Sequence, residues 1–120
     1  MPSPPSRSFE AELCGVRTHF VLTSYANRIF IVVTQTPNMG TLIVATADDP
    51  LNATGKSYST RVLLGKRDDE VLEAYARTMV ELINKEQPSA PPLLLAISIE
   101  KHSNELFREV MKHVIENRVW

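Results

Sequence analysis

The amino-acid sequence predicts an α+β domain, with a mainly antiparallel six-stranded sheet and two helices on one face. The first half of the chain consists of short apolar or alternating segments separated by turn residues, a pattern typical of strands. The second half contains two segments with the helical i, i+3, i+4, i+7 apolar spacing. A chain of 120 residues is long enough for one domain with its own core.

The strands are expected at residues 9–14, 17–24, 28–35, 41–46, 57–64 and 93–99. Val, Ile, Thr and Tyr, which favour strands, are frequent in them. Short connections such as residues 36–40, where Pro37 and Gly40 favour a turn, indicate antiparallel hairpins and a meander. The predicted element order is β-β-β-β-β-α-β-α.

Two amphipathic helices complete the prediction. Asp68 or Asp69 can cap the first helix, which is expected to end near residues 84–85, before Pro88. Ser103 can cap the second helix. The apolar face of this second helix comprises Leu106, Phe107, Val110, Met111, Val114 and Ile115.

Composition and charge exclude several classes of protein. A net charge of −1 argues against a broad electrostatic surface for nucleic acid or anionic membrane. The single cysteine, Cys14, favours a reducing compartment. We find no signal peptide and no apolar run of transmembrane length. These features predict a cytoplasmic or nuclear protein, with a disordered Pro/Ser-rich tail at residues 1–8 and one domain at 9–120.

The central strands have apolar residues on both faces, and two helices can cover only one face of a six-stranded sheet. A second sheet packed against the other face is the economical solution, since sheets pack about 10 Å apart. We therefore expect a dimer through a face that includes Phe30, Val32, Leu42 and Val44. The alternative is a sheet that curls over its own core.

Residues 52–59, NATGKSYS, contain the Gly-Lys-Ser ending of a phosphate-binding loop. The preceding glycine of that motif is replaced by Pro50, which has no N–H, and a strand rather than a helix follows. A nucleotide site is therefore not expected. Asn52 also begins a glycosylation sequon, which we interpret as incidental in a chain without a signal peptide.

No catalytic, cofactor-binding or metal-binding residue is predicted. The histidines His19, His102 and His113 lack metal-ligand spacing, and one cysteine cannot complete a zinc site. Cys14 has no general base beside it in the sequence and is expected to be a buried or semi-buried thiol.

Six short blocks of residues are distributed over nearly the whole chain. The blocks are Cys14-Gly15-Val16, Val32-Val33-Thr34-Gln35, Met39-Gly40-Thr41-Leu42, Val62-Leu63-Leu64-Gly65, Leu93-Leu94-Leu95-Ala96 and Val119-Trp120. In this order and spacing, from residue 9 onward, the chain resembles the proteasome assembly chaperone 3 family.

This resemblance implies a small non-catalytic protein that promotes assembly of the α-ring of the 20S proteasome. Such a protein would bind α-subunits transiently, as a dimer with an assembly chaperone 4-like paralogue or with itself. It also implies a sheet with helices on one side and a dimer with the sheets inside.

The loop at residues 46–56 is long for a connection between strands, which favours a functional or mobile segment. We expect it to contact the α-subunit, through Asp48, Asp49, Leu51, Asn52 and Lys56. Two other classes of protein stay open at this point. One is a generic dimeric adaptor without a proteasome client, and the other is a small enzyme with an unrecognised pocket.

Overall fold

The computed structural model describes residues 4–38, 40–48 and 57–120. Six strands and two helices follow one another in the predicted order. Their bounds are β1 Ser6–Leu13, β2 Val16–Ser24, β3 Ile29–Thr34, β4 Thr41–Ala47, β5 Tyr58–Leu64, α1 Glu70–Glu86, β6 Leu93–Ser98 and α2 Asn104–Glu116. The strand β1 begins three residues before the predicted start, because Ser6 already pairs with Thr23 of β2.

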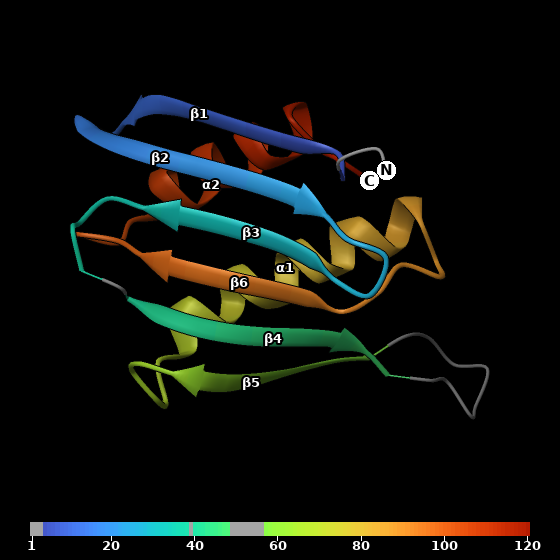
Figure 1. Ribbon diagram of the computed structural model, residues 1–120. Helices are drawn as coiled ribbons and strands as arrows, with labels where there is room; N and C mark the ends of the chain where they lie inside the picture. Colours follow the sequence, from blue (N-terminus) through green and yellow to red (C-terminus); the bar gives the residue numbers. More distant parts are fainter. Residues whose placement is uncertain (1–3, 39, 49–56) are drawn as a thin grey trace.

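The strands form one mixed sheet in the order β1-β2-β3-β6-β4-β5 (Figure 1). The first three strands form the predicted antiparallel meander. The predicted hairpin between β3 and β4 is wrong, since β6 lies between them, parallel to β3 and antiparallel to β4. The chain reaches this central position through α1, and a helical crossover is the usual connection to a strand that is parallel to an earlier one.

Both helices lie on the same face of the sheet, as predicted, with α1 over β4, β5 and β6 and α2 next to β1 (Figure 1). Asp69 caps α1, because its Oδ1 accepts hydrogen bonds from the Val71 and Leu72 backbone N–H groups at 3.0 and 3.2 Å. Ser103 caps α2 by accepting from the Leu106 N–H at 3.0 Å. Neither helix is long and apolar enough to span a membrane, within the part of the chain that is described.

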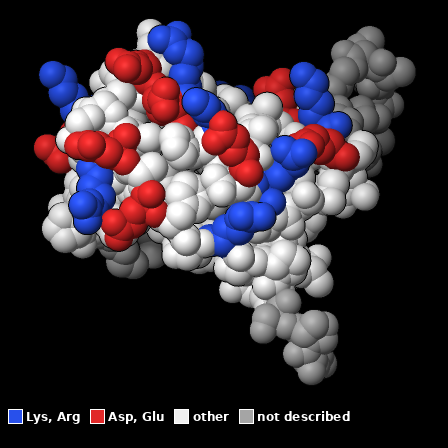
Figure 2. All heavy atoms as spheres, turned by 90° about the horizontal axis from the view of Figure 1, so that it is seen from above, with Lys and Arg blue, Asp and Glu red and all other residues white. Residues whose placement is uncertain are grey.

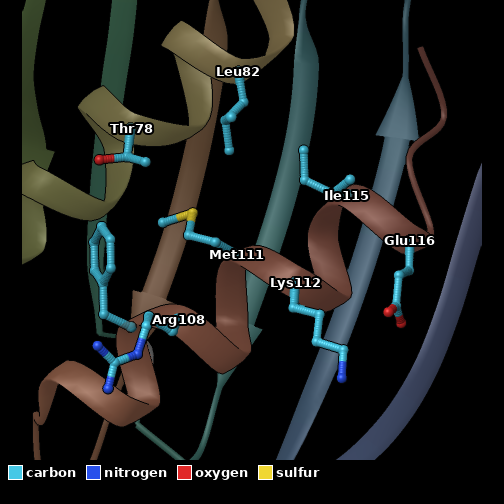
Figure 3. A pocket seen from close by; sticks show the side chains of 8 residues that line it. Thr78, Leu82, Arg108, Met111, Lys112, Ile115 and Glu116 are labelled. Carbon is cyan, nitrogen blue, oxygen red and sulfur yellow. The ribbon is translucent and has the colours of Figure 1, made fainter.

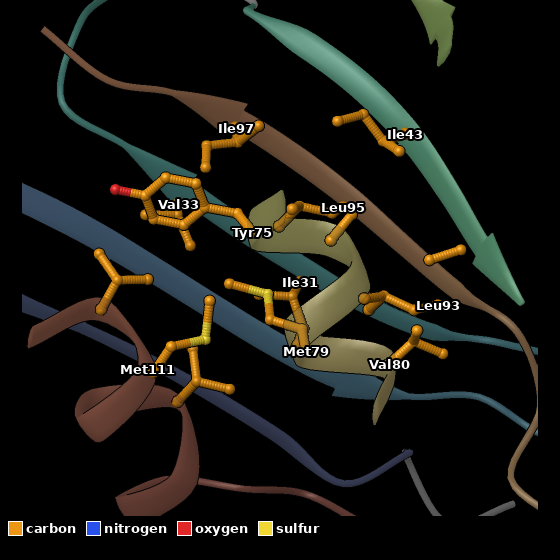
Figure 4. Close-up of a cluster of buried hydrophobic side chains, with 14 of the residues drawn as sticks. Ile31, Val33, Ile43, Tyr75, Met79, Val80, Leu93, Leu95, Ile97 and Met111 are labelled. Carbon is orange, nitrogen blue, oxygen red and sulfur yellow. The ribbon is translucent and has the colours of Figure 1, made fainter. Parts of the chain in front are cut away.

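The core lies between the helices and the inner face of the sheet. Side chains of β3, β4 and β6 point toward Tyr75, Met79 and Val80 of α1 and Met111 of α2 (Figure 4). In β3, β4 and β6 every second residue is buried, and the residues between them are mostly half-buried. The inner and outer faces of the sheet are therefore in different environments, although both carry apolar residues.

Two glycines allow the backbones of β4, β5 and β6 to approach closely at one corner of the sheet. Gly40 has φ +74°, and a Cβ there would overlap the carbonyl oxygen of Ile97 in β6. Gly65 has φ +100°, and a Cβ there would lie 2.6 Å from the carbonyl oxygen of Gly40. This corner of the sheet requires residues without a Cβ for both steric and conformational reasons.

Candidate interaction surface

The four residues predicted to form a dimer face share one face of the sheet. Phe30 and Val32 of β3 and Leu42 and Val44 of β4 are all half-buried, and they alternate with fully buried inner residues. The helices lie on the opposite side (Figure 1). None of the described residues forms a layer over these four side chains.

The strand register arranges this face in two rows. Phe30, Leu94 and Val44 are aligned across β3, β6 and β4. Val32, Ala96 and Leu42 form the second row across the same strands. We call these six residues the outer patch.

Sequence reasoning missed Leu94 and Ala96, although a signal was present. The segment that contains them has apolar residues at every position from Leu93 to Ile97, so one parity had to face outward. What the sequence could not supply was the position of β6 between β3 and β4, which puts Leu94 and Ala96 at the centre of the patch.

The second row extends beyond the outer patch on both sides. Val21 of β2 pairs with Val32, and Leu64 of β5 pairs with Leu42. A register shift in the β4–β5 pair brings Leu64, rather than Leu63, opposite Leu42. Leu64 is 55% exposed, the largest exposed fraction among the large apolar side chains described.

Polar residues surround the apolar rows. The first row ends at Thr23 on one side and Arg61 on the other. At the β1–β2 edge, Glu10 lies 3.3 Å from the Arg17 guanidinium and 3.2 Å from His19 Nδ1. An apolar centre inside a polar border is the usual composition of a protein–protein interface.

The charged side chains do not form a single-sign surface on the face shown in Figure 2. Lys and Arg alternate there with Asp and Glu. Nucleic acids are bound through clustered Lys and Arg, and this face has no such cluster.

The predicted contact loop falls mostly outside the described residues, which include Asp48 but not Asp49, Leu51, Asn52 or Lys56. Asp48 lies at the entrance of the loop, where its N–H donates to the Ser57 carbonyl oxygen at 2.8 Å. Its carboxylate accepts hydrogen bonds from the hydroxyls of Ser57, at 2.9 Å, and Ser59, at 2.8 Å. These bonds hold the two ends of the loop together as a continuation of β4 and β5.

The histidines take structural positions. His19 faces Glu10, His102 Nδ1 lies 3.1 Å from the Tyr75 hydroxyl, and His113 Nδ1 lies 2.8 Å from the Glu109 carbonyl oxygen. No group of three potential metal ligands occurs within residues 4–38, 40–48 and 57–120.

Burial, with a smaller contribution from the nearby Cys14, raises the pKa of Tyr75 to about 12.

The prediction of a buried or semi-buried thiol at Cys14 is wrong. The residue is exposed in the β1–β2 turn, where it has φ 51°. The tight turn between two paired strands keeps its side chain out of the core.

Comparison with known proteins agrees with this architecture. Residues 31–117 match the family model described as proteasome assembly chaperone 3. The chain belongs to the proteasome assembly chaperone 3 family. The matched segment contains every residue of the outer patch except Phe30.

Two members of this family illustrate how far the similarity extends. Proteasome assembly chaperone 3 of Bos taurus is 31% identical over 99% of this chain and 97% of its own length. The protein of the same name from Nematostella vectensis is 30% identical, over 90% of this chain and 84% of its own. The resemblance inferred from the short sequence blocks is thus confirmed.

A solved structure shares the fold at low sequence identity. It is a chaperone complex for yeast 20S proteasome assembly, and one of its chains superposes with a TM-score of 0.77. The superposition covers 92% of this chain and 96% of that one, at 15% identity. The predicted fold class, a six-stranded sheet with two helices on one face, is confirmed by the structure and by this neighbour.

Proposed function

We propose that this protein is a non-catalytic chaperone for assembly of the 20S proteasome α-ring. It would bind α-subunits transiently and act as a dimer, with itself or with an assembly chaperone 4-like paralogue. Membership of the proteasome assembly chaperone 3 family is the observation that supports this role, and it favours a proteasome client over a generic adaptor. The single thiol favours a cytoplasmic or nuclear location.

The outer patch supports a dimer in which two sheets face each other. Six aligned apolar side chains lie in the middle of a sheet face that the helices leave uncovered. A contiguous apolar face bordered by polar residues is typical of a surface that another protein covers. Two such faces packed about 10 Å apart would form a β-sandwich.

A pair of leucine substitutions tests the dimer. Leu42→Glu places a charge in the outer patch, whereas Leu82→Glu places the same charge at a half-buried position of α1. We expect Leu42→Glu to weaken dimerisation at least roughly a hundredfold, because a buried unpaired carboxylate costs several kcal/mol. Light scattering should then give a monomer mass for Leu42→Glu, alone and mixed with the paralogue, and a dimer mass for Leu82→Glu. A dimer mass for both variants contradicts the assignment of this face.

The client is tested with free α-subunits. Affinity purification followed by mass spectrometry should recover α-subunits together with an assembly chaperone 4-like protein. Absence of both would reject the proteasome role and leave the adaptor interpretation.

We also propose that the loop that begins after Asp48 contacts the α-subunit. The two residues that flank this loop, Asp48 and Ser57, are held together at the end of β4 and β5, because the Asp48 carboxylate accepts hydrogen bonds from the Ser57 and Ser59 hydroxyls. Deletion of residues 49–55 should reduce capture of α-subunits and leave the dimer mass unchanged. Capture equal to that of the intact protein removes the loop from the proposal.

A further inference from the structure

A groove runs between α1 and α2, on the side of the molecule opposite the outer patch (Figure 3). Its volume is about 530 Å³. Leu82 points from α1 toward Met111 and Ile115 of α2 (Figure 3). Phe107 adds a fourth apolar side chain to the lining.

The groove exists because the two helices cover different parts of the sheet. The helix α1 packs on β4, β5 and β6, whereas α2 packs near β1. Phe107, Met111 and Ile115 lie one turn apart along α2, so the apolar strip is about 12 Å long. Beyond Phe107 a second hollow of about 300 Å³ continues toward Val71, which is 37% exposed.

The charge on the rim is asymmetric. Arg108 and Lys112 border the groove on the α2 side, one turn apart. Among the described residues, neither cation lies within ion-pair distance of a carboxylate. Thr78 on the α1 side is uncharged, and the acidic Glu116 lies at the C-terminal end of the α2 strip.

The lining indicates what kind of segment fits. The groove walls are side chains of two helices, whose backbone N–H and C=O groups are already bonded within each helix. An extended peptide would find no backbone partners there, whereas a helix satisfies its own. A third helix could place apolar side chains, spaced i, i+4 and i+7, against Leu82, Met111 and Ile115. Met111 can adapt to different apolar partners.

We propose that the groove between α1 and α2 binds an amphipathic helix of a partner protein that carries acidic residues beside its apolar stripe. The acidic residues would pair with Arg108 and Lys112. This inference goes beyond the proposed function, since it concerns the face opposite the outer patch and requires no proteasome subunit.

The test uses two fluorescein-labelled helical peptides about four turns long. Both carry leucines at i, i+4 and i+7, and they differ only in having Glu or Lys at the flanking positions. Fluorescence anisotropy should show that the Glu peptide binds roughly tenfold more tightly than the Lys peptide at low salt. The difference should shrink at about 0.5 M salt, where exposed charges are screened.

Variants of the protein locate the site. The double variant Arg108→Glu/Lys112→Glu should prefer the Lys peptide, and Ile115→Ala should weaken both peptides about threefold or more. The control Arg77→Glu/Lys101→Glu also reverses two exposed cations but leaves the groove lining intact. It should keep the preference of the unmodified protein, and circular dichroism should show that all variants are folded.

Three peptide-binding results would overturn the proposal: no binding of the Glu peptide, equal binding of both peptides, and an unchanged preference in Arg108→Glu/Lys112→Glu. A change of mass in light scattering of that double variant would also overturn it, because it would identify a second copy of the chain as the occupant. Because the assay contains only this protein and a peptide, its outcome is independent of α-subunit capture.

Discussion

At the scale of single residues, two glycines distinguish the steric cost of a side chain from the cost of its backbone conformation. Gly15 and Gly40 have similar φ values, +79° and +74°. A Cβ at Gly15 would meet nothing within 4 Å, whereas one at Gly40 would overlap the backbone of β6 at Ile97. The pair therefore isolates the steric part of the cost of adding a side chain.

We predict that Gly15→Ala lowers the free energy of unfolding by about 1 kcal/mol, the usual cost of a left-handed alanine. Gly40→Ala should lower it by roughly 3 kcal/mol, because β4 and β6 must also move apart. Chemical denaturation of both variants measures the difference. Equal losses would show that the close approach of Gly40 to β6 adds no steric cost to the alanine side chain.

Tyr75 provides a prediction for alkaline pH. Its pKa is raised to about 12 in the folded protein by burial and, to a smaller extent, by Cys14, against an ordinary value of 10.0. Between these pH values the unfolded chain loses the phenolic proton while the folded chain keeps it. The free energy of unfolding therefore falls as pH rises through this window, by at most about 2.7 kcal/mol in all.

Urea unfolding at several values from about pH 9 to pH 11.5 tests this slope. In Tyr75→Phe the part of the slope due to Tyr75 should disappear, although the variant also loses the contact with His102. Tyr25→Phe is the matched control, because Tyr25 is 44% exposed. An equal slope in the unmodified protein and Tyr75→Phe would contradict the raised pKa.

At the scale of elements, the structure shows which of two adjacent aspartates caps α1, a choice that the sequence left open. Asp69 caps the helix, whereas the exposed Asp68 has φ +60° and accepts no hydrogen bond from the helix N–H groups. We predict that Asp69→Ala lowers the free energy of unfolding by about 1 kcal/mol. Asp68→Asn should change it little, since Asn tolerates the same conformation. Equal effects in thermal or chemical unfolding would contradict the assignment of the cap.

The helices and strands were predictable because each follows from the spacing of apolar residues within its own segment. The order of the strands was not, because it depends on which distant segment pairs with β3. The short connection at residues 36–40 favoured a β3–β4 hairpin, yet β6 occupies the central position. The apolar residues at nearly every position of β6 fit the centre of a sheet better than its edge. The prediction gave more weight to the turn at residues 36–40 than to this pattern.

The candidate surfaces were predictable to different degrees. The outer patch followed from apolar residues on both faces of the central strands, and Phe30, Val32, Leu42 and Val44 lie on one face as the dimer prediction required. The groove between the helices was not predicted. The sequence feature related to it is the apolar face of α2. The sheet does not cover this whole face, and Phe107 and Ile115 are therefore half-buried.

At the scale of the whole molecule, the sheet separates two apolar surfaces of different character. The outer patch is central and composed of aligned β-strand side chains, which suits a large and stable interface with a second sheet. The groove is a hollow of about 530 Å³ between two helices and is bordered by Arg108 and Lys112, which suits one helix. If two copies dimerise through the outer patch, the groove lies on the opposite side of each sheet and stays accessible to a partner.

If the dimer forms through the outer patch, its stability must depend on protein concentration. Unfolding of a dimer to two unfolded chains is favoured by dilution, and a hundredfold dilution corresponds to about 2.7 kcal/mol per dimer. We therefore predict that the Tm falls by about 5 °C over a hundredfold dilution. Scanning calorimetry or fluorescence at several concentrations measures this shift. In Leu42→Glu the Tm should be lower and independent of concentration, whereas Leu82→Glu should retain the dependence. A Tm that does not vary with concentration, both in the unmodified protein alone and in its mixture with the paralogue, would mean that the outer patch stays exposed to water, and the face-to-face dimer would then be rejected.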